Sequence, residues 1–194
     1  GSDEVCCGYL YLRNAPSAKE LQLESERLVN ELHYFDVLRS DRSISSNGLE
    51  ARTPFLDKTF VKYYLSIPAK LKVFNSKDRI EKHLLRKAYD DGTYLPGDVL
   101  WRRKVAFSDG VSSQKKSWHK IIQNHVDNKI SDEEFFKAKD LISHCTPILK
   151  ESYYYRKVFE SFFPNSEKLI PHFWMPRWSN VIDPSARELQ DYQE

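Results

Sequence analysis

The spacing of the apolar residues restricts the fold of this chain more than any other feature. In its N-terminal quarter, Leu21, Leu28, Leu32 and Phe35 recur at helical intervals, with Val29 beside them. This period places apolar side chains on one face of an α-helix, whereas a half-buried strand shows a period of two. No segment shows a convincing alternation of that kind, so we expect a mainly α-helical fold.

Capping and helix-breaking residues set the expected limits of the helices. Ser2 precedes two acidic residues and predicts a helix start, and the pattern Ser17-x-x-Glu20 predicts a capping box for a helix that continues to about Arg39. Pro16 ends the first of these units. Further helices are expected at 60–65, 78–89, 112–128, from Ser131 onward and at 150–163, with a loop at 70–78 and an irregular tail from Pro171.

The composition is that of a folded protein and argues against two classes of partner. The 194 residues, 40% apolar and 13% aromatic, suffice for one domain, and no linker divides residues 1–194. A net charge of +2 gives no electrostatic basis for nucleic acid as the main partner. No apolar run approaches the roughly 18 residues of a membrane span, and no signal peptide is evident, so we expect no membrane partner.

The cysteines and the first residue bear on the origin of the chain. Three cysteines without disulfide or zinc spacing predict free thiols in a reducing compartment, and hence a cytoplasmic location. The chain begins at Gly1, with no leader and no polar lead-in. We therefore expect a segment cut from a longer protein.

The stretch LWRRKVAFSDGV places three cations in apolar surroundings. Arg102, Arg103 and Lys104 stand between Trp101 and the apolar triplet at 105–107. Surface charge is the simplest interpretation of each cation, but the flanking aromatic residues indicate that at least one points inward. A buried lysine needs an anion, and its compact ammonium group suits a phosphoryl group that moves during a reaction.

Two further clusters carry acidic residues. Asp3 and Glu4 at a helix start are either a favourable pair at the positive end of the helix dipole or part of a magnesium site, because hard cations take carboxylate oxygens. Asp36, Arg39 and Glu50, the last within GLEARTPFLD, lie close to apolar residues. They predict either a structural network of ion pairs or a polar pocket for a zwitterionic substrate.

The remaining candidates are weaker. The six histidines are scattered without ligand spacing, and Ser108 has no adjacent histidine that would support a hydrolase triad. The pair Cys6-Cys7 is more typical of a core than of a nucleophile. From the residues alone, the interpretation stops at a helical domain with a lysine that handles phosphate.

Six blocks in order along the chain carry a resemblance to a known family. They are GSDEVCCGYLYLRNAP, DRSISSNGLEARTPFLDKTF, EKHLLRKAY, LWRRKVAFSDGV, TPILKESYYYRKVFESFFP and WMPRWSNVIDPSAR. Together they resemble the glutamine-hydrolysing asparagine synthetases over nearly the whole chain. The resemblance implies the helical C-terminal portion of an α/β synthetase domain of the ATP-pyrophosphatase type.

The resemblance also implies a reaction and its participants. The family adenylates the side-chain carboxylate of aspartate with ATP and Mg²⁺, and ammonia from glutamine then displaces AMP to give asparagine. The implied partners are aspartate, ATP, ammonia and the rest of the synthetase. The isolated chain is expected to expose an apolar patch where the missing sheet would dock, through which a homodimer could form.

Site roles follow from the matched blocks. Lys104 matches the lysine of the block Arg-x-Lys-Glu-x-Phe-Ser-Asp-Gly and is implied to neutralise the α-phosphate and the departing pyrophosphate. Asp3 matches the acidic residue near magnesium pyrophosphate and is implied as catalytic residue and metal ligand. The implied substrate-binding residues are Arg102 at the phosphates and Asp36, Arg39 and Glu50 near the aspartate pocket.

The chain departs from the family pattern in two respects. Val105 stands where the family has glutamate after the lysine, and neither a Ser-Gly-Gly-x-Asp-Ser phosphate loop nor an N-terminal catalytic cysteine is present. The first hypothesis is therefore a synthetase fragment that is inactive alone. The alternatives are a related enzyme that forms another amide or a lactam, favoured by Val105, and a non-catalytic helical interaction module.

Overall fold

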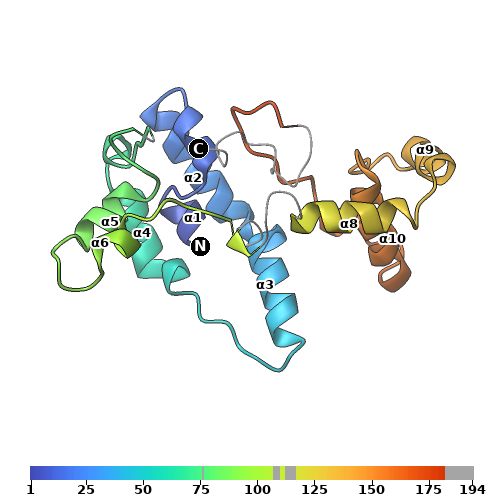
Figure 1. Ribbon diagram of the computed structural model, residues 1–194, viewed down its shortest axis with the longest axis horizontal. Helices are drawn as coiled ribbons and strands as arrows, with labels where there is room; N and C mark the ends of the chain where they lie inside the picture. The colour runs from blue at the N-terminus through green and yellow to red at the C-terminus, as the bar shows by residue number, and fades with distance from the viewer. Residues whose placement is uncertain (76, 107–109, 112–116, 182–194) are drawn as a thin grey trace. The chain divides into compact units, whose positions relative to one another are not determined.

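The structure is a computed structural model that describes residues 1–75, 77–106, 110–111 and 117–181. Within these ranges the regular secondary structure is α-helix and 3-10 helix, with no strand, so the prediction of a mainly α-helical fold is confirmed (Figure 1). Ser108 and the first residues of the helix expected at 112–128 lie outside the described residues. No helix in the described ranges combines the length and apolar character needed to cross a bilayer.

The described residues form two compact units. The first comprises 1–104 and 176–179, and the second comprises the described parts of 105–175 and 180–181. The first unit contains the helices α1 (Ser2–Val5), α2 (Ala18–Glu31), α3 (Asp36–Ser45), α4 (Lys58–Ser66), α5 (His83–Ala88) and α6 (Gly97–Leu100), with 3-10 turns at Leu10–Asn14, Leu32–Tyr34, Pro54–Leu56 and Ala69–Leu71.

The core of the first unit surrounds the short helix α1. Val5 and Cys6 are buried with Tyr64 of α4, and half-buried side chains such as Leu84 of α5 pack against them. Helix α1 contacts both α2 and α4. Removing these apolar side chains from water stabilises a turn that is too short to be helical by itself, since isolated helices below about 12 residues are marginal in water.

The N-terminal helices follow the predicted caps in part. Ser17 caps α2 as predicted, and its hydroxyl accepts the Glu20 N–H at 3.2 Å. At the N-terminus the prediction is wrong by one residue, because Gly1 occupies the cap position and Ser2 already lies in α1.

The helix predicted to continue to Arg39 is wrong in its extent. Helix α2 ends at Glu31, a 3-10 turn follows, and Phe35 leaves the helical region with φ −122° and ψ −99°. A new helix, α3, begins at Asp36 and contains no fully buried residue. The apolar spacing of Leu28, Leu32 and Phe35 continues across this break, so the spacing alone did not reveal it.

The helix predicted at 78–89 is shorter in the structure. Helix α5 begins only at His83, because the Asn75 side chain accepts the backbone N–H groups of residues 77, 78 and 79, and Lys82 takes a left-handed conformation with φ 58°. An asparagine that satisfies backbone donors in this way competes with helix formation. The helix predicted at 60–65 is present as α4, where Asp57 caps Thr59 and Phe60 at 2.9 and 3.0 Å.

The second unit is a small helical cluster. It consists of α8 (Trp118–Asp127), α9 (Asp132–Leu141) and α10 (Lys150–Phe162), with a 3-10 turn at Glu167–Leu169. The Ser131 hydroxyl accepts the Glu134 N–H at 3.1 Å and caps α9, and α10 ends one residue short of its predicted limit. The core consists of Val126, Ile130, Phe135, Ala138 and Tyr153.

Candidate functional site

The N-terminal turn brings Asp3 and Gly8 into contact. Cys7 takes a left-handed conformation with φ 56°, and the chain turns back so that the Gly8 N–H donates to the Asp3 carbonyl at 2.8 Å. A β-carbon on Gly8 would lie 2.1 Å from Asp3 Oδ1 and 2.3 Å from Lys82 Cε. Glycine is therefore required here by the close approach of two side chains.

Two ammonium groups hold the Asp3 carboxylate. Lys82 Nζ lies 2.7 Å from Oδ1, and Lys104 Nζ lies 2.7 Å from Oδ2. Burial alone would raise the pKa of Asp3, but the two lysines outweigh it, so that this pKa lies below its usual value. One carboxylate between two lysines leaves a net charge of +1, which favours an anionic ligand.

Lys104 is the inward-pointing cation of its stretch. Arg102 and Arg103 are exposed, whereas the Lys104 side chain is 17% exposed. Its ammonium group lies 5.9 Å from the centre of the Tyr9 ring, a distance at which the aromatic face attracts a cation. The prediction that at least one of the three cations points inward is confirmed.

The position of Lys82 depends on tertiary structure. Its left-handed backbone lies next to the N-terminal turn, where its N–H donates to the Cys7 carbonyl at 3.3 Å and its Nζ donates to Ser2 Oγ at 3.0 Å. Lys82 was not among the site residues predicted from the sequence. The block EKHLLRKAY was the available signal, but an uninterrupted helix at 78–89 gave no reason to expect Lys82 beside Asp3.

Tyr9 connects a second group of acids to this site. Its hydroxyl lies 2.6 Å from Glu4 Oε1 and 3.0 Å from Asp36 Oδ2. Burial and the two carboxylates raise the pKa of Tyr9, so the phenol keeps its proton and donates it. Arg39 pairs with the other oxygen of Asp36. The structure thus connects the predicted pair Asp36–Arg39 with helix α1 through Tyr9.

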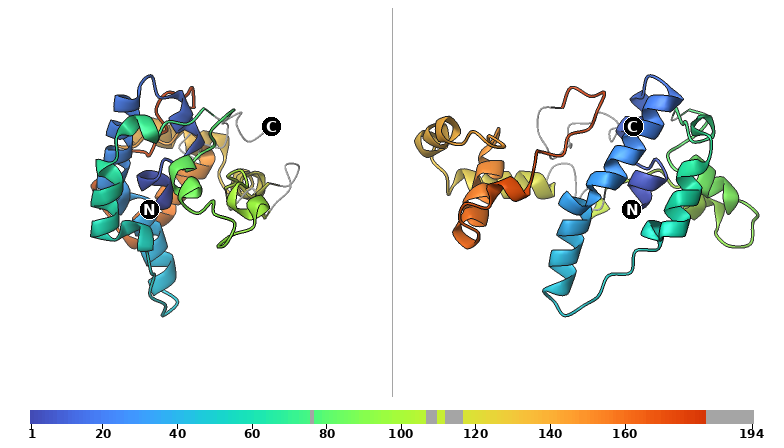
Figure 2. Two further views of the ribbon diagram at one scale, coloured as in Figure 1. Left: turned by 90° about the vertical axis from the view of Figure 1, so that its left-hand side faces the viewer. Right: turned by 180° about the vertical axis from the view of Figure 1, so that it is seen from behind.

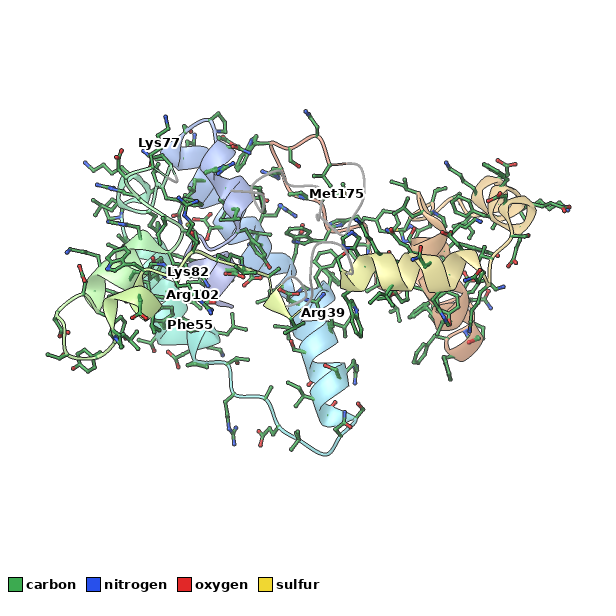
Figure 3. All side chains as sticks on the ribbon, viewed as in Figure 1. Arg39, Phe55, Lys77, Lys82, Arg102 and Met175 are labelled. Atoms are coloured by element: carbon green, nitrogen blue, oxygen red, sulfur yellow. The ribbon has the colours of Figure 1, made fainter. Side chains whose placement is uncertain are left out.

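Two of the predicted site residues, Glu50 and Arg102, are exposed. Glu50 is exposed and pairs with Arg52 at 2.9 Å in the loop after α3, at the end of that helix remote from α1 (Figures 1 and 2). Arg102 is exposed on the segment after α6, and Figure 3 labels it together with Lys82 and Arg39.

The described residues offer an anion site more readily than a metal site. They contain no group of three or more histidine, cysteine, aspartate or glutamate side chains able to hold a metal. Both oxygens of Asp3 form ion pairs with ammonium groups, and these two positive charges oppose the binding of a magnesium ion to the same carboxylate. The donor set of two lysines instead suits phosphate oxygens.

Comparisons with known proteins identify the family of this chain. The family model described as asparagine synthase matches residues 13–186. The chain is 50% identical over 193 residues to the asparagine synthetase [glutamine-hydrolyzing] of Gallus gallus, and 48% identical to those of Bos taurus and Homo sapiens. Each alignment covers 100% of this chain and 34% of the relative, so the chain spans about a third of their length. The chain therefore belongs to the asparagine synthase family.

Proposed function

We propose that residues 1–194 form the helical C-terminal part of an ATP-dependent synthetase that converts aspartate to asparagine. The observation that carries this proposal is the ion-paired cluster of Asp3, Lys82 and Lys104, in a chain that belongs to the asparagine synthase family. The chain spans a third of the length of its relatives, so the proposal assigns the activity to the longer protein. The other partners proposed are ATP, ammonia from glutamine and the rest of the synthetase.

In the proposed reaction, an oxygen of the aspartate side-chain carboxylate attacks the α-phosphorus of ATP. The bond to pyrophosphate breaks, and the acyl-adenylate keeps the AMP group until ammonia displaces it. Lys104 and Lys82 stabilise the charge on the phosphates, and each donor aimed at charge that develops in a transition state contributes about 3 to 4 kcal/mol. The exposed side chain of Arg102 is proposed to bind the phosphates of the nucleotide.

The amino-acid pocket is proposed around the pair Asp36–Arg39. A carboxylate and a guanidinium side by side match the ammonium and carboxylate groups of a zwitterionic amino acid. Tyr9 holds Asp36 beside helix α1, which supports this placement. Glu50 is proposed for the same pocket on the resemblance of its motif alone.

Magnesium enters the proposal with the nucleotide. Protein-bound Mg²⁺ usually keeps several waters and takes substrate phosphates together with one or two carboxylates. Because Asp3 is engaged by two lysines, we assign no step of the reaction to the metal. Asp3 as a metal ligand, the homodimer and the cytoplasmic location stay predictions.

The test removes the ammonium group of Lys104 in the full-length synthetase. Lys104→Ala is expected to lower aspartate-dependent ATP–pyrophosphate exchange about 100- to 1000-fold, while glutamine hydrolysis persists. Arg103→Ala is the matched control, because it removes an exposed positive charge from the adjacent position. Exchange at the wild-type rate in Lys104→Ala would refute the role of this lysine.

Val105 supports a second candidate, a related adenylating enzyme that forms another amide or a lactam. Val105 is 52% exposed and supplies no carboxylate beside Lys104. A different substrate could therefore be accommodated next to the lysine. Pyrophosphate exchange measured with a panel of carboxylic acids separates the two candidates, since the first requires aspartate to give the highest kcat/KM.

A further inference from the structure

Glu81 is a buried acid whose side chain reaches the backbone of the proposed catalytic lysine. Its side chain is 3% exposed, and its Oε1 atom accepts the Lys104 backbone N–H at 2.9 Å. The contact joins residues 23 positions apart in the chain. A buried carboxylate needs strong partners, because its desolvation is costly.

Arg86 supplies the second partner and a second attachment. Its Nη2 donates to Glu81 Oε1 at 2.6 Å, and its Nε donates to the Glu81 carbonyl at 2.9 Å. Its Nη1 donates to the carbonyl of Leu100, at the end of α6. The chain from Leu100 to Lys104 is therefore held at both ends by one ion pair, of which the acid is buried and the arginine is half-buried.

We propose that Glu81 and Arg86 are positioning residues that hold the backbone of Lys104 so that its ammonium group stays at Asp3. This inference rests on the proposed function, because it assumes that Lys104 acts on the nucleotide phosphates. Neither Glu81 nor Arg86 needs to touch a substrate. They act through the lysine alone.

Electrostatic repulsion is the reason that such a restraint is needed. Lys82 and Lys104 place two positive charges on the two oxygens of one carboxylate, each at 2.7 Å, so the ammonium groups repel each other. A long lysine side chain also loses rotamer entropy when it is held in one position. Fixing the Lys104 backbone opposes both effects, because fewer rotatable bonds of Lys104 can then move its ammonium group away from Asp3.

The principal test replaces the ion pair by apolar residues in the full-length synthetase. In Glu81→Leu/Arg86→Met neither charge is left unpaired, and such replacements of buried ion pairs are often tolerated. We expect an unchanged melting temperature within a few degrees, an unchanged KM for ATP, and a kcat for pyrophosphate exchange lowered about 100-fold, as for a displacement of about 1 Å. Glu81→Gln, which keeps an acceptor oxygen for the Lys104 N–H, should retain most of the wild-type rate.

A double-mutant cycle distinguishes positioning from general structural support. In a Lys104→Ala background the same pair of changes should lower the residual exchange very little, because the group that they position is already absent. An equal loss in both backgrounds, or a folded double variant with wild-type exchange, would overturn the inference. Wild-type exchange in Lys104→Ala alone would instead refute the role proposed for Lys104, and the absence of aspartate-dependent exchange in the wild-type synthetase would refute the proposed function.

Two further variants keep the test decisive. If Glu81→Leu/Arg86→Met does not fold, Arg86→Lys enters the same cycle, since lysine keeps the charge but lacks the planar fork that reaches Leu100 and Glu81 together. The control is Glu31→Leu, which removes another acid paired with arginine, 2.6 Å from Arg27 on α2. We expect it to leave exchange unchanged.

Discussion

Gly8→Ala tests the geometry of the Asp3 site with a single added carbon. The new β-carbon would lie 2.1 Å from Asp3 Oδ1, 2.3 Å from Lys82 Cε and 2.9 Å from Asp3 Cα. The first two atoms belong to side chains that can move, but the third is backbone. The two shortest contacts involve the side chains of Asp3 and Lys82, so we expect the substitution to displace this ion pair more than the backbone.

The size of the effect follows from these contacts. The contact with Oδ1 must lengthen by about 1 Å before it is tolerable, because nonbonded atoms repel steeply at shorter distances. That movement is large beside the 2.7 Å that joins Asp3 to Lys82. We expect a loss of about 1 to 3 kcal/mol in the free energy of unfolding, as for other overpacked sites, and about a 100-fold loss of exchange activity.

The assay measures pyrophosphate exchange and thermal unfolding of the same preparations. Gly97→Ala is the matched control, because no atom lies within 4 Å of its β-carbon position and alanine favours the helix that begins there. It should leave exchange unchanged and stability equal or slightly higher. A Gly8→Ala protein with wild-type activity and stability would show that the close approach of Asp3 and Lys82 is not the native arrangement.

Three other outcomes can be checked. The pKa of Asp3 is lowered in the folded protein, so its ion pairs stabilise the fold at neutral pH. This contribution is lost only as the pH falls below about 4 through the folded pKa. When the free energy of unfolding is measured as a function of pH, Asp3→Asn should show a smaller decrease in this acid range. Burial raises the pKa of Cys6 to about 12 and that of Cys7 to about 11. Both thiols should therefore resist iodoacetamide at pH 8 in the folded protein and react on unfolding. Rapid labelling of either thiol in the native protein would contradict their burial. Glu24 is fully buried, and its carboxylate accepts hydrogen bonds from Arg27 at 2.7 and 2.8 Å. Glu24→Ala should therefore lower the free energy of unfolding, measured with urea, by about 3 to 5 kcal/mol. A decrease below about 1 kcal/mol would show that water replaces the carboxylate.

Local signals accounted for much of the secondary structure. Ser17 and Ser131 begin helices as predicted, because a hydroxyl that accepts a free N–H three residues later is a contact within one turn. The helix predicted at 150–163, after Pro147 and in a segment rich in tyrosine and phenylalanine, is present as α10. Phe35 was missed because the break that it makes leaves the apolar spacing intact.

The candidate site was only partly predictable. Lys104 was singled out by its apolar neighbours, and its inward position is confirmed. Lys82 and Glu81 were missed, because the helix predicted through both positions did not indicate that either side chain would contact Asp3 or Lys104. In the structure, the left-handed backbone of Lys82 interrupts that helix, and the two side chains reach Asp3 and the Lys104 backbone.

The order of residues along the chain by itself determined the helical class, several caps and the family, because each of these depends on neighbours in sequence or on blocks of adjacent residues. Only the tertiary structure decided that Asp3 and Lys104, 101 positions apart, form one ion pair and that Glu81 accepts the backbone N–H of Lys104. The physical reason is the range of the interactions. Periodicity and capping act within a few residues, whereas two opposite charges meet only after the apolar core around α1 has brought distant segments together.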